Sequence, residues 1–455
     1  MRVINPADNQ FVKEYNNDSS EIVQLKLEKA QKAFLDWKKT EFSYRAKLMR
    51  NAAEILRKRS QEYAELMTIE MGKLISSGKA ESEKCAWVCD YYAENAEKFL
   101  QDEPIITDAD KSFITYQPFG VILAIMPWNF PFWQVFRFAA PNLMAGNAGL
   151  LKHASNVPGC ALQIEKIFLE AGFPEAVFQT LLIGSTETKA VIENPIVKAV
   201  TLTGSTPAGK SVAETAGKVL KKCVLELGGS DPYIILADAD IDNAVDLCLT
   251  SKLINSGQSC IAAKRFIVVK EVVEEFTTKF LNKMSQQKLG DPTDPRTKIG
   301  PMARTDLRDE LHHQVQKSIE QGAKCILGGY VPEMNGAFYP ATILTDVKKG
   351  MLAYSEEIFG PVAVIITAVN EAEAIQIAND TSFGLGAAIF TSNQQKGEEI
   401  AAKKLEAGCC FVNDFVKSDP RLPFGGIKES GFGRELARAG ILEFVNTKTV
   451  SINNY

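Results

Sequence analysis

The sequence predicts an α/β fold in which parallel sheets are covered on both faces by helices. With 455 residues the chain is long enough for two or three domains. Short apolar runs alternate with helical patterns along most of the chain, which is typical of parallel sheets. The alternation occurs as two successive runs, and Gly228-Gly229 between them indicates a hinge.

The elements follow in order along the chain. Residues 22–100 are rich in Ala, Glu, Lys and Leu and predict long amphipathic helices. After Gly120, strands are predicted near residues 121–125, 148–152, 177–183, 197–203 and 223–227. The helices between them are expected near residues 134–145, 158–171 and 186–193, with one more before residue 223. The second run is predicted to contain strands at 233–236, 266–269 and 411–412 and a Gly/Asp/Pro-rich loop at 290–295.

The composition is that of an ordinary soluble globular protein, with 45% hydrophobic and 24% charged residues. The net charge of −5 is small and no basic stripe occurs, so no nucleic-acid partner is expected. The N-terminus is no signal peptide, and the most apolar stretch, residues 119–133, is too short to cross a bilayer. We therefore expect a cytoplasmic protein without a membrane partner. The nine cysteines include no C-x-x-C pair, so neither a metal site nor a disulfide framework is predicted.

Cys260 is the candidate nucleophile, because small residues surround it and leave its thiol accessible. Glu226 ends an apolar strand before two glycines, so its carboxylate can turn into the same cleft. The chain has only three histidines, and His312-His313 lies in a polar helical run. The base that serves Cys260 is therefore expected to be a carboxylate. A thiol and a water-activating carboxylate together suit a two-stage covalent mechanism.

Residues 204–211 fit the phosphate-binding pattern G-x-x-x-x-G-K-S, which makes a P-loop NTPase the alternative from another class. Pro207 counts against it, because it removes one backbone N–H from the loop that would hold the phosphates. A glycine-rich turn at a helix N-terminus can still receive the pyrophosphate of a dinucleotide. No G-x-G-x-x-G follows the first strand, so the usual dinucleotide fingerprint is missing.

Asn129 lies in the rigid segment Pro127–Pro131 and has two possible roles. It could cap a turn, or its side-chain amide could stabilise a developing oxyanion. The segment alone favours the structural role.

These residues together resemble the aldehyde dehydrogenase superfamily over essentially the whole chain. The motifs that carry the resemblance occur in the order of that family: Pro127–Pro131, Lys152, Thr203-Gly204-Ser205, Glu226–Gly229, Gly257–Cys260, Glu357–Pro361 and Pro423–Gly426. The resemblance implies that Cys260 forms a thiohemiacetal and that Asn129 stabilises its oxyanion. Hydride then passes to a nicotinamide, and Glu226 activates the water that hydrolyses the thioester. The implied cofactor-binding residues are Trp128, Lys152, Ser155, Gly204, Ser205, Glu357 and Phe359.

The resemblance also indicates the two reactants. Relatives that prefer NAD commonly carry a glutamate at the position of Ser155, and that glutamate would repel a 2′-phosphate. Ser155 together with Lys152 therefore predicts that NADP is preferred, with NAD possible. Trp133, Arg137 and Ser418 match substrate-site positions of bacterial succinate-semialdehyde dehydrogenases, and Arg137 would clamp a substrate carboxylate. A salt bridge from Arg137 to a protein carboxylate is the alternative. Another semialdehyde or an aliphatic aldehyde also stays open as the substrate.

The resemblance implies a Rossmann-like cofactor domain (1–101 and 118–228), an α/β catalytic domain (229–440) and a small β oligomerisation element (102–117 and 441–455). Residues 112–116 and 449–452 alternate as strands and could pair between subunits. A homodimer or homotetramer is expected. A non-catalytic homologue is the third class of function, and the intact set of Cys260, Glu226 and Asn129 counts against it.

Overall fold

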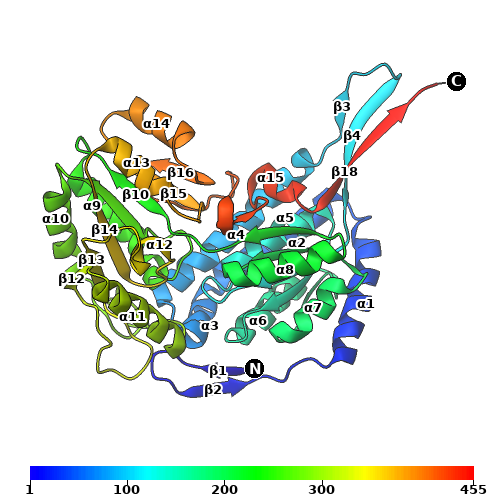
Figure 1. Cartoon of the computed structure of the whole chain (residues 1–455). Coiled ribbons are helices and arrows are strands. Elements are labelled where there is room, and N and C mark those ends of the chain that lie inside the picture. The colour runs from blue at the N-terminus through cyan, green and yellow to red at the C-terminus, as the bar shows by residue number, and fades with distance from the viewer. Residues whose placement is uncertain (455) are drawn as a thin grey trace.

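The computed structural model describes residues 1–454 and contains two large sheets, which lie in two domains side by side (Figure 1). The sheet of the first domain has six strands. Five of them are parallel, and the sixth, β17, pairs antiparallel with β9 at the edge. Their order is β17 (Gly431–Phe432), β9 (Lys222–Glu226), β8 (Val197–Thr203), β5 (Val121–Met126), β6 (Ala148–His153) and β7 (Phe178–Thr180).

Alternating side chains of the central strand β5 explain why helices cover both faces of this sheet. Val121 and Leu123 pack against one helical layer, which comprises α1 (Ser20–Trp37), α7 (Ser185–Glu193) and α8 (Thr206–Lys218). Ile122 and Ala124 pack against the other layer. That layer comprises α2 (Phe42–Lys58), α3 (Ser60–Met71), α4 (Ile75–Phe99), α5 (Trp133–Ala145) and α6 (Pro158–Glu170).

The second domain has a seven-stranded sheet that is parallel except for the edge strand β12. Its order is β12 (Lys324–Leu327), β13 (Thr342–Thr345), β14 (Val362–Ala368), β11 (Arg265–Val269), β10 (Pro232–Ile235), β15 (Gly386–Phe390) and β16 (Cys409–Val412). One face packs on α9 (Ile241–Leu253) and α10 (Val273–Ser285). The other packs on α11 (Thr305–Glu320), α12 (Leu352–Ser355), α13 (Glu371–Asn379) and α14 (Gln394–Lys403). The predicted α/β class and the predicted strands of both runs are confirmed.

A three-stranded antiparallel sheet projects from the first domain as an arm (Figure 1). It consists of β3 (Glu103–Ile105), β4 (Lys111–Pro118) and β18 (Val445–Ile452). The two predicted strands are present, but they pair with each other within one chain, with Thr115 opposite Lys448. The helix α15 (Ala437–Leu442) leads directly into β18, and Phe119 N donates to Phe444 O (3.3 Å) at the base of the arm. This junction brings the two strands together without a second subunit.

Two features were not predicted. The edge strand β17 comes from within residues 229–440, the range expected for the other domain, and Gly431 of β17 lies opposite Glu226. An N-terminal hairpin, β1 (Arg2–Ile4) with β2 (Phe11–Glu14), lies below both domains in Figure 1. Its turn reaches the second domain, since Ala337 N donates to Pro6 O (2.8 Å).

Among the described helices, none is long and apolar enough to cross a membrane.

Candidate active site

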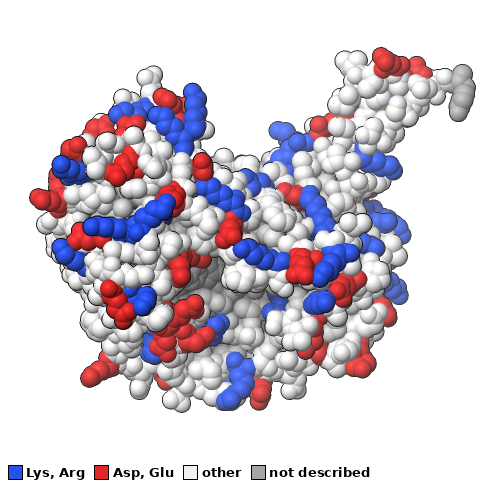
Figure 2. Space-filling view, in the orientation of Figure 1, with Lys and Arg blue, Asp and Glu red and all other residues white. Residues whose placement is uncertain are grey.

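Cys260 lies where two pockets meet. Of the residues that line these two pockets, it is the one that belongs to both. The first pocket, of about 280 Å³, lies between the two domains, where the surface in Figure 2 is hollowed. The second, of about 350 Å³, is bordered by α4, α5 and the segment after β16. A thiol with one pocket on each side can bring two different reactants into contact.

The loop before Cys260 is held in an uncommon conformation. Asn255 and Ser256 have left-handed backbones, with φ of 52° and 56°, and Gly257 follows with φ of 79°. The Asn255 side chain donates to Asn129 O (2.8 Å), and Ser256 Oγ accepts from Gly300 N (2.9 Å). Such conformations are costly and persist only where surrounding contacts fix them, as they do here. The loop therefore holds the thiol at a defined place in the cleft.

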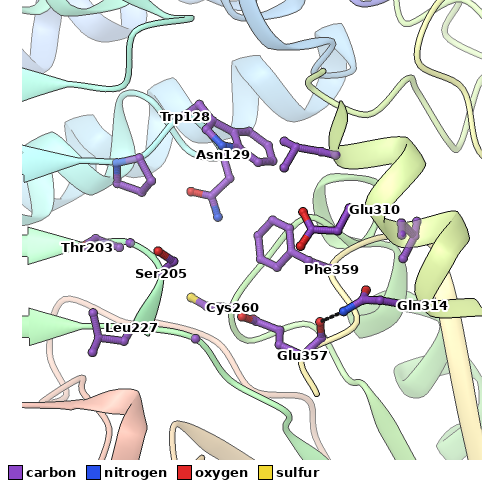
Figure 3. A pocket seen from close by; sticks show the side chains of 15 residues that line it. Trp128, Asn129, Thr203, Ser205, Leu227, Cys260, Glu310, Gln314, Glu357 and Phe359 are labelled. Atoms are coloured by element: carbon purple, nitrogen blue, oxygen red, sulfur yellow. Dashed lines mark hydrogen bonds between the residues drawn. The ribbon is translucent and has the colours of Figure 1, made fainter. Parts of the chain in front are cut away.

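The Asn129 side chain makes two contacts that bear on the two roles its sequence left open. Its Oδ1 accepts from Phe130 N (3.1 Å), which is a local turn contact. Its Nδ2 donates to Gln258 O (3.2 Å), two residues before Cys260. Figure 3 shows the carboxamide pointing toward Cys260. The amide thus has the orientation that a donor to an oxyanion on Cys260 needs.

Lys264 holds the loop that carries Cys260 from the other side. Its Nζ donates to Cys260 O (2.6 Å) and Ser259 O (2.7 Å), and it lies 3.4 Å from Glu357 Oε1. Burial raises the pKa of the Cys260 thiol to about 12, while the positive charges of Lys264 and Arg137 oppose that rise. Sequence reasoning missed Lys264, and the available signal was a lysine just after the apolar run Ile261-Ala262-Ala263.

Glu226 ends β9 as predicted, but its side chain lines neither pocket. Both carboxylate oxygens are buried and have no hydrogen-bond partner among residues 1–454. A Cβ added at Gly425 would lie 2.8 Å from Oε1, so the carboxylate occupies space that this glycine leaves free. Burial raises the pKa of Glu226 to about 8, Arg137 opposes the rise, and Glu435 adds to it. The carboxylate must turn from this position to reach water beside Cys260.

None of the three histidines lines either pocket. His153 is buried, and its ring nitrogens bond to Pro131 O (2.9 Å) and Ala154 N (2.8 Å). Its burial lowers its pKa to about 4, so the ring is neutral. His312 contacts Tyr339 Oη (3.2 Å). The titratable bases that line the two pockets are therefore carboxylates, and the assignment of one of them as the base for Cys260 stays a prediction.

The P-loop interpretation of residues 204–211 is wrong. Ser205 caps α8, and the helix begins at Thr206, so no loop remains to surround a triphosphate. Gly209 is small because Leu227 packs on it, and a Cβ there would lie 2.5 Å from Leu227 Cδ1. Lys210 points away and pairs with Glu429 (2.8 Å).

The first pocket contains five of the predicted cofactor-binding residues: Trp128, Gly204, Ser205, Glu357 and Phe359. The rings of Trp128 and Phe359 meet edge to face at 5.9 Å (Figure 3). Gly204 and Ser205 place the N-terminus of α8 at the pocket wall, which is suited to a pyrophosphate. Glu357 Oε1 accepts from Gly229 N (3.1 Å), which anchors this carboxylate at the hinge.

Lys152 and Ser155 lie outside the lining of this pocket, at and after the end of β6. Because β6 is the neighbour of β5 in a parallel sheet, both residues lie at the same carboxyl edge as Trp128. Burial lowers the pKa of Lys152, and the charge of Glu187 in α7 opposes that change. This edge is where open α/β sheets bind ligands.

The second pocket contains the three predicted substrate residues, Trp133, Arg137 and Ser418. Arg137 is not free, because its Nε forms an ion pair with the buried carboxylate of Glu435. Its Nη2 lies 3.4 Å from Thr203 Oγ1, and its guanidinium lies 4.8 Å from the centre of the Phe424 ring. The salt bridge that the sequence left as an alternative is therefore present. The prediction that Arg137 alone binds the substrate carboxylate is corrected, because the carboxylate of Glu435 already neutralises its charge.

Among residues 1–454, no group of three or more His, Cys, Asp or Glu side chains is arranged to hold a metal ion. All nine cysteines are free thiols.

Comparison with known proteins places these pockets in context. Residues 1–450 match the model described as the aldehyde dehydrogenase family. A Synechocystis sp. protein with the name Probable succinate-semialdehyde dehydrogenase (NADP(+)) is 53% identical over 452 residues, 99% of each chain. Succinate-semialdehyde dehydrogenase (NADP(+)) 1 of Mycobacterium tuberculosis is 48% identical over 457 residues, again 99% of each. The succinic semialdehyde dehydrogenase of Streptococcus pyogenes, solved in complex with NADP+, superposes with a TM-score of 0.97 at 40% identity over 100% of both chains.

Proposed function

Because this chain belongs to the aldehyde dehydrogenase family, we propose that it oxidises succinate semialdehyde to succinate with NADP+ as the oxidant. The observation that carries the proposal is the position of Cys260 between two pockets. One pocket has the helix N-terminus and aromatic walls suited to a dinucleotide, and the other contains cationic side chains suited to an anionic aldehyde. The names of the relatives at 48–53% identity support the same substrate and oxidant.

The residues of the first pocket fit the dinucleotide. Ser205 and the N-terminus of α8 would hold its pyrophosphate, and Glu357 would hold the ribose next to the nicotinamide. Lys152 and Ser155 would accept the 2′-phosphate, because they offer a positive charge and a hydroxyl, and position 155 itself carries no carboxylate. When bound, NADP+ supplies the hydride acceptor. We infer a preference for NADP+ over NAD+.

The protein's own groups account for the covalent chemistry. The Cys260 thiol releases its proton to water in the cleft, and its Sγ adds to the aldehyde carbon. The oxygen that becomes negative lies toward the Asn129 amide and the Cys260 backbone N–H. Loss of hydride from that carbon leaves a thioester on Cys260. Glu226 then takes a proton from water, the hydroxide adds to the thioester carbon, and the C–S bond breaks to release the acid.

We further infer a cytoplasmic homodimer or homotetramer. The arm formed by β3, β4 and β18 supports self-association, because it projects from the body and exposes Ile105 and Ile106.

Steady-state kinetics test the proposal. Succinate semialdehyde, glutarate semialdehyde and butanal are each assayed with NADP+ and NAD+, and kcat/KM is compared. We expect the highest value for succinate semialdehyde with NADP+. Equal values for succinate semialdehyde and butanal would refute the substrate, and a clear preference for NAD+ would refute the oxidant. The Ser155→Glu variant should move the cofactor ratio toward NAD+, with the aldehyde preference unchanged.

A further inference from the structure

Lys84 is a cation of the second pocket that forms an ion pair with no carboxylate of the described part of the chain. It lies in α4, and its partly buried side chain lines the same pocket as Cys260. Its Nζ donates to Ser418 Oγ (2.7 Å), its one hydrogen-bond partner among residues 1–454. The Nζ also lies 4.3 Å from the centre of the Trp133 ring, within the range of a cation–π contact.

The acidic residues near Lys84 have other partners. Glu81 pairs with the buried Lys73 (2.5 Å) and accepts from the backbone N–H of Phe132 and Trp133, both at 2.9 Å. Asp419 pairs with Arg421 (2.6 Å). Neither carboxylate forms an ion pair with Lys84 among residues 1–454, so both act on it only from a distance. Burial lowers the pKa of Lys84 to about 8, Arg137 adds to that fall, and the charges of Glu81 and Asp419 oppose it. The ammonium is therefore largely charged at neutral pH in a partly desolvated position, where an anion would be stabilising.

Arg137 differs from Lys84 in this respect. The pair of Arg137 with Glu435 is close to neutral as a unit, although Arg137 still offers N–H donors to the pocket. Lys84, Arg137 and Glu435 together therefore carry one positive charge in excess. One excess positive charge matches a substrate that carries one carboxylate.

We propose that Lys84, held by Ser418, binds the carboxylate at the far end of the aldehyde and sets the preference for anionic aldehydes. The inference rests on the proposed function and names the residue that supplies the charge. An ammonium has three N–H donors, and Ser418 uses one of them. The remaining donors can reach a carboxylate in the pocket while the aldehyde group lies at Cys260.

The test compares wild type with Lys84→Met and Lys84→Gln in the full-length protein. The assays use succinate semialdehyde and butanal, a neutral aldehyde of the same chain length, with NADP+. We expect KM for succinate semialdehyde to rise roughly ten- to hundredfold in both variants, because a charged hydrogen bond is lost. For butanal, both kcat and KM should stay within about twofold of wild type, which also shows that the variants fold. Lys79→Met, which removes an exposed lysine from the same helix, is the matched control and should behave as wild type.

The outcomes separate the two proposals. If wild type prefers succinate semialdehyde and the Lys84 variants keep that preference, the role of Lys84 is refuted and the proposed function stands. If wild type shows no preference for succinate semialdehyde over butanal, the proposed function fails, and the role of Lys84 fails with it. The glutamine variant keeps a polar contact to Ser418, so it serves if the methionine variant does not fold.

Discussion

Two buried carboxyl groups near the thiol share one guanidinium. Arg137 forms an ion pair with Glu435, whereas Glu226 forms no ion pair with any residue of the described part of the chain. Burial raises the pKa of both carboxyl groups, and that of Glu226 reaches about 8. Glu226 is therefore largely protonated at neutral pH and becomes a base only as the pH rises.

Deacylation should consequently accelerate with pH. Glu226 must be ionised to take a proton from water, so kcat limited by thioester hydrolysis should increase through a midpoint near pH 8 and level off above it. The measurement is kcat against pH at saturating substrate, with the pre-steady-state burst of NADPH followed in parallel. A kcat that is flat from pH 6.5 to 9.5 while the burst is complete would count against Glu226 as the base.

The Glu226→Gln variant provides the direct check. It should still form about one NADPH per active site in a burst, because Cys260 and Asn129 are intact. Steady-state turnover should fall at least roughly 100-fold, the usual size of general-base catalysis. Full turnover in this variant would assign water activation to another group.

Single residues could be predicted from sequence when they lie in short contiguous motifs. Cys260, Asn129, Ser205 and Glu357 belong to this class, and the structure places all four at the first pocket. Lys84 could not be predicted, because its contact with Ser418 spans 334 positions of sequence. In the sequence it is one lysine among many on an amphipathic helix. The partner of Arg137 was hidden for the same reason, since nothing local indicates Glu435.

At the scale of elements, α8 shows why a pattern of glycines can mislead. The pattern G-x-x-x-x-G-K-S at residues 204–211 fits either a phosphate-binding loop or a tightly packed helix. The residue at which the helix begins decides between the two. Here the helix begins at Thr206, so the pattern reflects the cap by Ser205 and the contact between Gly209 and Leu227.

In the loop that carries Cys260, one added methyl group should be costly. Gly257 has φ of 79°, and a Cβ there would lie 2.1 Å from Gly360 O, which is backbone and cannot rotate away. Gly257→Ala should destabilise the protein by about 1–2 kcal/mol through the left-handed backbone alone, and the clash adds to this. The accompanying shift of Cys260 should lower kcat/KM by roughly 100-fold. Thermal unfolding and burst amplitude together measure both effects, and an unchanged burst would contradict the expected displacement.

At the scale of the whole molecule, the sequence predicts the two α/β runs because buried parallel strands have long apolar signatures. Residues 112–116 and 449–452 were expected to pair between subunits, and their pairing as β4 and β18 within one chain was not predicted. Nor was the pairing of the two-residue strand β17 with β9, because exposed or edge strands carry no signal for what they pair with. The resulting arm stands away from both domains, and its strands β3 and β18 lie at its edges (Figure 1). Unpaired edges of this kind can add strands or apolar contacts from a second copy of the chain.

Self-association through the arm can be tested by adding charge to its exposed apolar side chains. Ile105 and Ile106 are 44% and 102% exposed in the single chain, so their replacement by lysine should not disturb the fold. If a second copy covers them, the Ile105→Lys, Ile106→Lys double variant must bury two ammonium groups and should dissociate toward monomers. Analytical ultracentrifugation of wild type and variant measures the change. Leu220→Lys, at a 95% exposed leucine on the first domain, is the control and should sediment as wild type. An oligomer that survives the double substitution would show that another surface of the chain holds the subunits together.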